Sequence, residues 1–322
     1  MSVVKILEVL SPGILTSVQD MGRYGYGRYG VAPSGALDFF SLRIGNLLVG
    51  NAEDDAGLET TLMGLRIKAL TDIVIAVTGG NLQPQRGKQS LKMWRSHVLM
   101  RDDILSFKGP LNGFRSYITV SGGIYSSPLM GSRSTNLPSG FGGIEGRGLK
   151  QGDVLFSELL PEHLQHTERQ FKPEWIPNYR NSWILRAVWG PQDDHFTSEA
   201  RDMFLASTFK MSPDSDRSGI RLQGPVIPCK PDVGESIISE GVISGAIQIP
   251  GDGQPIIILG ETVTGGYRKI AAVISADLQL LGQIRPGDDV RFRAVPLKQA
   301  HDAFRNMEEK IRGFKENLLR RR

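Results

Sequence analysis

The chain has 322 residues, of which 40% are hydrophobic and 22% charged, so it can bury a sizeable core and form about two domains. The net charge of +4 resides in residues 297–322, which hold eight Lys or Arg and four Asp or Glu. The remainder is near neutral, which argues against a nucleic-acid-binding protein. A single cysteine, Cys229, excludes an internal disulfide, and the five histidines lack convincing metal-ligand spacing.

No signal peptide is recognisable at the start of the chain, and no apolar run approaches the roughly 20 residues that span a bilayer. We therefore expect a cytoplasmic protein that does not cross a membrane.

Short strands separated by glycine-rich turns are predicted for the first half. One helix is predicted at Asp38–Val49, because its apolar residues fall on one face and Gly50 and Asn51 follow it. The predicted strands are Val3–Leu10, Ile14–Val18, Ala56–Leu62, Leu65–Leu70, Ile73–Val77, Ile104–Phe107, Arg115–Val120 and Asp153–Phe156.

A change in composition separates the two halves. Residues 160–181 contain Pro161, Pro173 and Pro177 without a clear period, which predicts a linker. Beyond it we predict a helix at Asp193–Leu205, with Phe196, Met203 and Phe204 as its apolar contacts, a turn that begins at Phe209–Pro213, and a short helix from near Ser275. The predicted strands are Trp183–Val188, Arg221–Pro225, Ile237–Val242, Ala246–Pro250, Ile256–Leu259 and Val290–Val295.

The last segment shows the clearest period in the chain. Its apolar residues follow a 4-3-4-3-4 spacing that predicts an amphipathic, basic helix: Ala300, Phe304, Met307, Ile311, Phe314 and Leu318. Packing back on the body is the default interpretation, and docking on a partner or a second copy is the alternative. The sequence thus predicts a mainly β protein with domains at 1–159 and 182–296, a linker at 160–181 and a helix at 297–322.

Polar residues in or beside glycine-rich turns are the candidate binding residues. Arginine in such turns suits a bidentate grip on a carboxylate or phosphate, although a structural salt bridge is equally compatible with each. Together they suggest recognition of an anionic small molecule, and no nucleophile motif accompanies them. They are Gln19, Asp20, Arg23, Asp38, Ser132, Arg133, Ser134, Arg147, Arg217, Arg221 and Glu240.

A second candidate region is the stretch from Gly245 to Pro286. Gln248 and Gln254 offer a donor and an acceptor each, which suits an amide or a carboxamide-like ring. The turn Thr264-Gly265-Gly266-Tyr267 lets another backbone or a ligand approach closely, because glycine has no Cβ. A tight hairpin at a barrel corner is the alternative interpretation of the same residues.

A series of short motifs, many of them glycine-containing, follows a fixed order along nearly the whole chain. They are Ser17-Val18-Gln19-Asp20, Ser34-Gly35-Ala36-Leu37-Asp38, Arg115-Ser116-Tyr117, Gly122-Gly123-Ile124, Gly131-Ser132-Arg133-Ser134-Thr135, Asp216-Arg217, Ser239-Glu240-Gly241, Gly245-Ala246-Ile247-Gln248 and Thr264-Gly265-Gly266-Tyr267. In this order the motifs resemble those of the allophanate-hydrolase-subunit-2-related family.

The resemblance implies two cyclophilin-like β-barrel domains and a C-type component of an ATP-dependent 5-oxoprolinase. It implies a B-type (allophanate hydrolase subunit 1-like) partner that shares ATP with this chain, and an A-type subunit that completes the opening of 5-oxoproline to glutamate. Two alternatives follow from the same family. One is the carboxyltransferase half of a urea or amide carboxylase, served by a biotin carrier; the other is a non-catalytic antagonist of a kinase inhibitor. No catalytic residue is assigned.

The chain departs from the family in the stretch that carries the candidate turn. Gly260, Thr262, Val263 and Arg268 stand where the family commonly has Asp, Gln, Thr and Pro. The first two changes remove a carboxylate and an amide that a ligand could use. An altered specificity is one interpretation.

Overall fold

The structure is a computed structural model that describes residues 3–158, 163–234 and 236–320. The chain divides into two compact units. Unit 1 comprises Met1–Arg23, Ser34–Tyr179 and Ile311–Arg322, and unit 2 comprises Tyr24–Pro33 and Arg180–Lys310.

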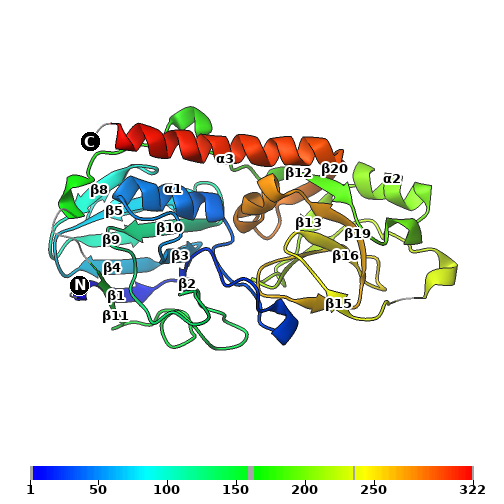
Figure 1. Cartoon of the computed structure of the whole chain (residues 1–322), viewed down its shortest axis with the longest axis horizontal. Helices are drawn as coiled ribbons and strands as arrows, with labels where there is room; N and C mark the ends of the chain where they lie inside the picture. The colour runs from blue at the N-terminus through cyan, green and yellow to red at the C-terminus, as the bar shows by residue number, and fades with distance from the viewer. Residues whose placement is uncertain (1–2, 159–162, 235, 321–322) are drawn as a thin grey trace. The chain divides into compact units, whose positions relative to one another are not determined.

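Two antiparallel sheets form unit 1 (Figure 1). The six-stranded sheet runs in the order β11 (Val154–Ser157), β1 (Val4–Pro12), β4 (Leu65–Ala69), β9 (Ile104–Phe107), β6 (Pro84–Arg86) and β7 (Gln89–Ser90). The five-stranded sheet runs β2 (Leu15–Gln19), β3 (Gly57–Thr61), β10 (Arg115–Val120), β5 (Ile73–Gly79) and β8 (Ser96–Leu99).

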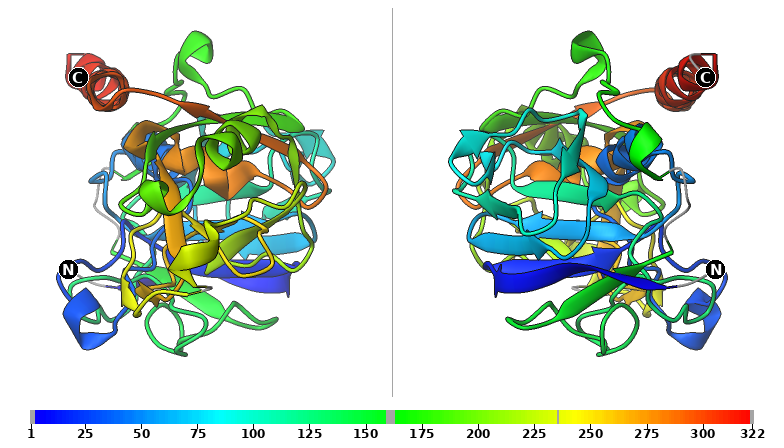
Figure 2. Two further views of the ribbon diagram at one scale, coloured as in Figure 1. Left: turned by 90° about the vertical axis from the view of Figure 1, so that its right-hand side faces the viewer. Right: turned by 90° about the vertical axis from the view of Figure 1, so that its left-hand side faces the viewer.

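One apolar core joins the two sheets of unit 1. Ile6 and Ile67 of the six-stranded sheet and Ile75 and Ile118 of the five-stranded sheet are fully buried in the same cluster. Every residue of β5 is buried, as its uninterrupted apolar sequence predicts for a strand covered on both faces. The other face of β5 and β10 is covered by the helix α1 (Phe39–Val49), as Figures 1 and 2 show.

Residues 163–179 fall in the range expected to be a linker, and the structure includes them in unit 1. They contain the short 3-10 helices η2 (His163–Gln165) and η3 (Pro173–Trp175). Phe171 is fully buried and stacks on Trp94, with ring centroids 5.7 Å apart. Large aromatic rings therefore fix a segment whose prolines suggest an extended linker.

Unit 2 is built on a closed seven-stranded barrel (Figure 1). Its strands follow the order β12 (Ser182–Trp189), β19 (Arg268–Val273), β16 (Ala246–Ile249), β17 (Ile256–Ile258), β14 (Gly219–Gln223), β13 (Phe209–Met211) and β20 (Asp289–Ala294). The parallel pairing of β12 with β20 closes the barrel, so neither strand leaves an open edge.

The remaining elements of unit 2 surround the barrel. The ribbon of β15 (Glu240–Gly241) and β18 (Thr264–Gly265) pairs apart from it. The helices are η1 (Gly27–Tyr29), η4 (Asp193–His195), α2 (Ser198–Ala206), η5 (Pro231–Val233) and η6 (Ser275–Gln283).

The C-terminal helix α3 (Leu297–Leu319) is confirmed, and it packs back on the body. Ala300, Met307, Ile311 and Phe314 of its apolar seam are buried, whereas Phe304 is 38% exposed. Its residues up to Lys310 are counted in unit 2 and those from Ile311 onward in unit 1. None of the helices in the described ranges is long and apolar enough to cross a membrane.

The mainly β fold class is confirmed, and so is the short helix from Ser275, which is of the 3-10 type. Phe209 begins the strand β13, and the predicted turn follows at residues 213–214. Two local predictions were wrong. The helix predicted at Asp193–Leu205 is interrupted between η4 and α2, and Met203 is 42% exposed. Only Glu240 and Gly241 of the strand predicted at Ile237–Val242 are paired.

Candidate functional site

Asp20, directly after β2, holds the loop 131–134 in place. Its carboxylate accepts hydrogen bonds from the N–H of Gly22 and the Oγ of Ser132, each at 2.7 Å, from the N–H of Arg133 at 2.5 Å, and from the Oγ of Ser134. Asp20 is only 7% exposed. The structure therefore brings together four residues that the sequence singled out, and the Asp20 carboxylate is used to fix the loop.

Gln19 and Arg23 are buried beside this loop. The Gln19 amide donates to Ser17 Oγ at 3.0 Å and to Thr135 O at 3.2 Å. The Arg23 guanidinium donates to Ser34 Oγ at 3.0 Å and to the Ser134 carbonyl. Both side chains link the loop to the body of unit 1, so the structure gives them a scaffolding geometry.

Asp38 caps the N-terminus of α1. Its carboxylate accepts from the N–H of Ser41 at 2.9 Å and from the hydroxyl of Tyr179 at 3.1 Å. The Asp38 N–H donates to the Tyr117 hydroxyl, which in turn donates to Glu59 at 2.6 Å. Burial and the nearby Glu59 and Asp38 carboxylates raise the pKa of Tyr117 well above its usual range, so it remains a neutral donor.

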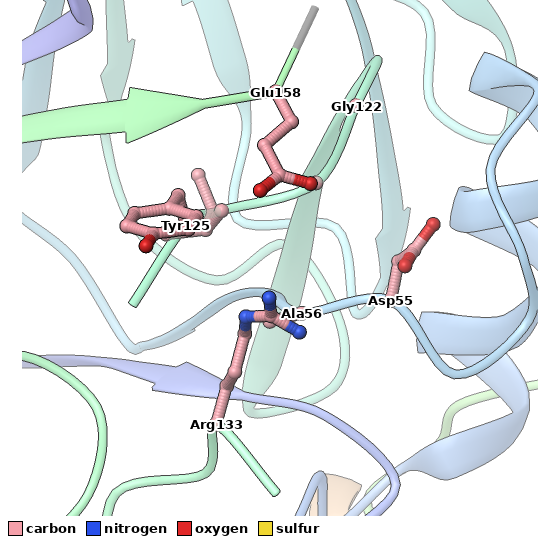
Figure 3. A pocket seen from close by; sticks show the side chains of 8 residues that line it. Asp55, Ala56, Gly122, Tyr125, Arg133 and Glu158 are labelled. Atoms are coloured by element: carbon pink, nitrogen blue, oxygen red, sulfur yellow. The ribbon is translucent and has the colours of Figure 1, made fainter. Parts of the chain in front are cut away.

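A small polar cavity lies next to the loop that Asp20 holds (Figure 3). We call it the Asp55 pocket; its volume is about 80 Å³, and its lining residues are Asp55, Ala56, Gly122, Gly123, Ile124, Tyr125, Arg133 and Glu158. The wall depends on a glycine, because Gly122 has a φ of +83° and a Cβ there would lie 2.6 Å from the Glu158 carbonyl oxygen.

Arg133 extends into the Asp55 pocket from the loop 131–134 (Figure 3). Its Nε donates to the Ser126 carbonyl at 2.9 Å, and its guanidinium carbon lies 5.8 Å from the centre of the Tyr125 ring. Figure 3 shows the guanidinium end pointing between Asp55 and Glu158. One cation and two carboxylates thus face a space that holds on the order of five water molecules.

The Asp55 carboxyl is perturbed by this environment. Burial raises its pKa, and the negative charges of Asp54 and Glu158 act in the same direction, against the hydrogen bond from the Ala52 N–H and the charge of Arg133. A carboxyl whose pKa is raised by folding destabilises the fold when it ionises, so this cost appears as pH rises through the folded pKa.

We expect Asp55→Asn to raise the urea-unfolding midpoint at pH 7, because the substitution removes the cost of ionising this carboxyl in the fold. The gain should vanish by about pH 3, below the ordinary aspartate pKa of about 3.9, where the carboxyl is largely protonated in both the folded and the unfolded chain. Asn keeps the acceptor for the Ala52 N–H, and Asp202→Asn is the control, since Asp202 is exposed and does not act on Asp55. A midpoint gain that is equal at both pH values, or equal in both variants, would contradict the assignment.

Arg147 is fixed by two carboxylates. Its Nη1 and Nη2 lie 2.8 and 3.0 Å from the Asp153 carboxylate oxygens, and Glu145 lies at 2.8 Å. The Arg147 guanidinium holds the pKa of Asp153 below its usual range. This bidentate pair occupies the guanidinium edge that a ligand would need.

In unit 2, Glu240 and Lys269 form an ion pair beside the β15–β18 ribbon. Gln192 donates to the Glu240 carboxylate at 2.9 Å and accepts from the Lys269 N–H at 3.1 Å. The Lys269 ammonium, followed by Gln192, holds the pKa of Glu240 below its usual range. The side chain of Lys269 is only 7% exposed, so its ammonium is held by this cluster.

Gln248 lies on the strand next to this cluster, with Lys269 as its strand partner. It is 3% exposed, and its Nε2 has no hydrogen-bond partner in the described part of the chain. Gly265 covers it, because a Cβ at that position would lie 2.3 Å from this nitrogen. At Gly265 it is therefore a side chain that approaches closely, whereas the sequence predicted a backbone or a ligand. A buried donor without an acceptor is unfavourable, which makes Gln248 a candidate for contact with a ligand carbonyl.

The other predicted residues of unit 2 are scattered. Arg217 forms a buried ion pair with Glu261 at 2.7 Å. Arg221 is exposed, and Gln254 exchanges hydrogen bonds with the backbone of Gly224. Thr264 is exposed on the ribbon, whereas Gly266 and the exposed Tyr267 lie just beyond it.

Arg268, which stands where proline is common in the family, is 1% exposed. Its Nε donates to His195 Nδ1 at 3.3 Å, and its Nη2 donates to the carbonyls of Val233 and Gly234. Thr262 donates to the Ser218 carbonyl at 3.1 Å. These departures thus have structural partners, and Arg268 ties the segment around η5 to the barrel.

Sequence reasoning missed the residues that complete both clusters: Asp55, Tyr125, Glu158, Gln192 and Lys269. Asp55 and Glu158 follow other elements and meet Arg133 only in the fold. Of these residues, Lys269 would have been the easiest to predict, because it lies two residues after the Thr264–Tyr267 turn. Within the described ranges, no group of three or more His, Cys, Asp or Glu side chains could hold a metal ion.

Comparison with known proteins identifies the family. The profile of the carboxyltransferase domain, subdomain A and B, matches residues 29–294. The chain belongs to this carboxyltransferase domain family. Its relatives include the 5-oxoprolinase C subunit of Escherichia coli (strain K12), 36% identical over 92% of this chain and 93% of the relative. The corresponding Haemophilus influenzae protein is 32% identical over the same shares.

Solved structures of carboxyltransferase domain relatives support the fold. The K. lactis urea amidolyase superposes with a TM-score of 0.91 at 33% identity. The match covers 97% of this chain but only 20% of the urea amidolyase, so this chain corresponds to about one fifth of that larger protein. The resemblance predicted from the sequence motifs is confirmed.

Proposed function

We propose that the chain is the C-type component of an ATP-dependent 5-oxoprolinase, an amidase-type hydrolase that opens 5-oxoproline to glutamate. The observation that supports this best is that the alignment spans almost the full length of both proteins. It covers 92% of this chain and 93% of a relative named as the C subunit of 5-oxoprolinase. The name of that relative implies further subunits. We infer that this chain acts with a B-type and an A-type subunit in the cytoplasm and is inactive alone.

The Asp55 pocket does not fit ATP. Its volume is about 80 Å³, whereas ligand pockets typically reach about 300–1,000 Å³. The carboxylates of Asp55 and Glu158 would also repel the phosphates. We therefore assign the nucleotide to a site completed by the partner subunit, and the Asp55 pocket to a smaller molecule.

Reconstitution tests the proposal. The purified chain, combined with B-type and A-type subunits, is expected to convert 5-oxoproline to glutamate with consumption of ATP, and each subunit alone should be inactive. Glutamate release and ADP release are measured together. A correctly assembled complex without either product would refute the proposed function.

The carboxyltransferase half of a urea or amide carboxylase is the second candidate, favoured by the TM-score of 0.91 to the urea amidolyase. It requires a biotinylated carrier that passes a carboxyl group to the substrate. Stimulation by a carboxylated carrier, measured as ¹⁴C transfer to urea or an amide, would favour it. A tight complex that turns over none of these substrates would favour a non-catalytic antagonist.

A further inference from the structure

The open hydrogen-bonding positions of the Asp55 pocket define its ligand. The backbone N–H of Arg133 donates to Asp20 and its Nε donates to Ser126, whereas its two Nη nitrogens donate no hydrogen bond to the described residues. The Glu158 carboxylate likewise accepts none from these residues, and Asp55 uses only one oxygen, for the Ala52 N–H. Donors and acceptors therefore lie open on opposite sides of one small space.

The charges in the pocket exclude simple ions. A free anion would gain the Arg133 guanidinium but would meet the carboxylates of Asp55 and Glu158. A free cation would meet the guanidinium instead. A neutral group that carries an acceptor on one side and an N–H on the other satisfies both sides without repulsion.

An amide is the common group of this kind, since its carbonyl oxygen accepts and its nitrogen donates. We propose that the Asp55 pocket binds a small neutral amide, a lactam or a urea, with its carbonyl oxygen on the Arg133 guanidinium and its N–H on the Glu158 carboxylate. The ring of 5-oxoproline carries such an amide, so the biological role of this site rests on the proposed function. The binding itself can be measured on this chain alone.

The shape of the pocket agrees with a small planar ligand. Gly123 also has a positive φ, of +67°, and a Cβ there would lie 3.4 Å from the Cβ of Asp55. With Gly122, it leaves backbone and not side chains along this wall. The Tyr125 ring, which lies beside the guanidinium, supplies a flat apolar surface for one face of the ligand.

Ligand-observed NMR titration of the full-length chain tests the proposal with the neutral amides 2-pyrrolidone and urea as probes. Acetate and methylammonium serve as the ion controls. We expect the amides to bind more tightly than either ion. Arg133→Gln and Glu158→Gln should each weaken 2-pyrrolidone binding about tenfold or more, because each removes a hydrogen bond to a charged group. Arg95→Gln is the matched control, since Arg95 pairs with the exposed Glu168 outside the pocket.

Each outcome decides one of the two proposals. Binding of acetate as tight as that of 2-pyrrolidone would make this a plain anion site and overturn the assignment, as would unchanged amide binding in folded Arg133→Gln and Glu158→Gln variants. Amide binding in this chain, without turnover in the reconstituted complex, would retain the pocket and refute only the proposed activity. Turnover of the reconstituted complex with an unchanged KM in both variants would retain the proposed activity and refute only the amide site.

Discussion

Replacing Arg217 by alanine is expected to lower the free energy of unfolding by about 3–5 kcal/mol, because it leaves the Glu261 carboxylate buried without its main counter-charge. The Arg217 and Glu261 side chains are only 4% and 1% exposed, and their closest atoms are 2.7 Å apart. Urea unfolding monitored by tryptophan fluorescence measures the loss. Trp183 and Trp189 lie in the same unit and report on it.

Lys210→Ala is the matched control for Arg217→Ala. Lys210 and Asp289 are also 2.7 Å apart in unit 2, but their side chains are 65% and 39% exposed. Water screens such a pair, and its loss should cost no more than about 1 kcal/mol. Because the two ion pairs have the same distance between their charged atoms, a difference between the two variants reports the effect of burial alone. Equal losses in both would show that Arg217 and Glu261 are not held in the interior as the structure has them.

The same ion pair shows why function is hard to infer from residue type. Arg217 follows an acidic residue in a glycine-containing turn, which suggests a grip on an anionic ligand. Its partner, Glu261, lies 44 residues further along, and nothing local in the sequence indicates that the two meet. The local sequence could therefore single out Arg217 as a candidate, but it could not identify Glu261 as its counter-charge.

Local signals were sufficient for most of the fold. The apolar run of β5 and the capping residues of α1 act within a few positions of the elements that they specify. Residues 163–179 needed a contact that is distant in sequence, because Phe171 is fixed by Trp94 and Phe314. In the candidate site, Gln248 and Gly265 could be singled out from one glycine-rich stretch, while Asp55 and Glu158 carry no local motif.

Asp20→Ala is expected to lower the free energy of unfolding of unit 1 strongly. Four donors converge on this buried carboxylate, and alanine would leave those of Gly22, Ser132, Arg133 and Ser134 without their acceptor. Hydrogen bonds to a charged group contribute about 1.5–3 kcal/mol each, and rearrangement of the loop should limit the total loss to about 3–5 kcal/mol. Urea unfolding measures the loss, and Ser132→Ala, which removes one of the four bonds, should cost about 1–2 kcal/mol.

The location of this damage distinguishes a loop anchor from a general core residue. The N–H groups of Arg133 and Ser134 are bonded to Asp20 and to Ser132 Oγ, so hydrogen exchange at both should accelerate in Asp20→Ala more than exchange in β5. Because the loop carries Arg133 into the Asp55 pocket, amide binding should weaken in parallel although Asp20 does not line the pocket. Uniform acceleration of exchange through unit 1 with intact binding would instead mean that the loop keeps its geometry without Asp20.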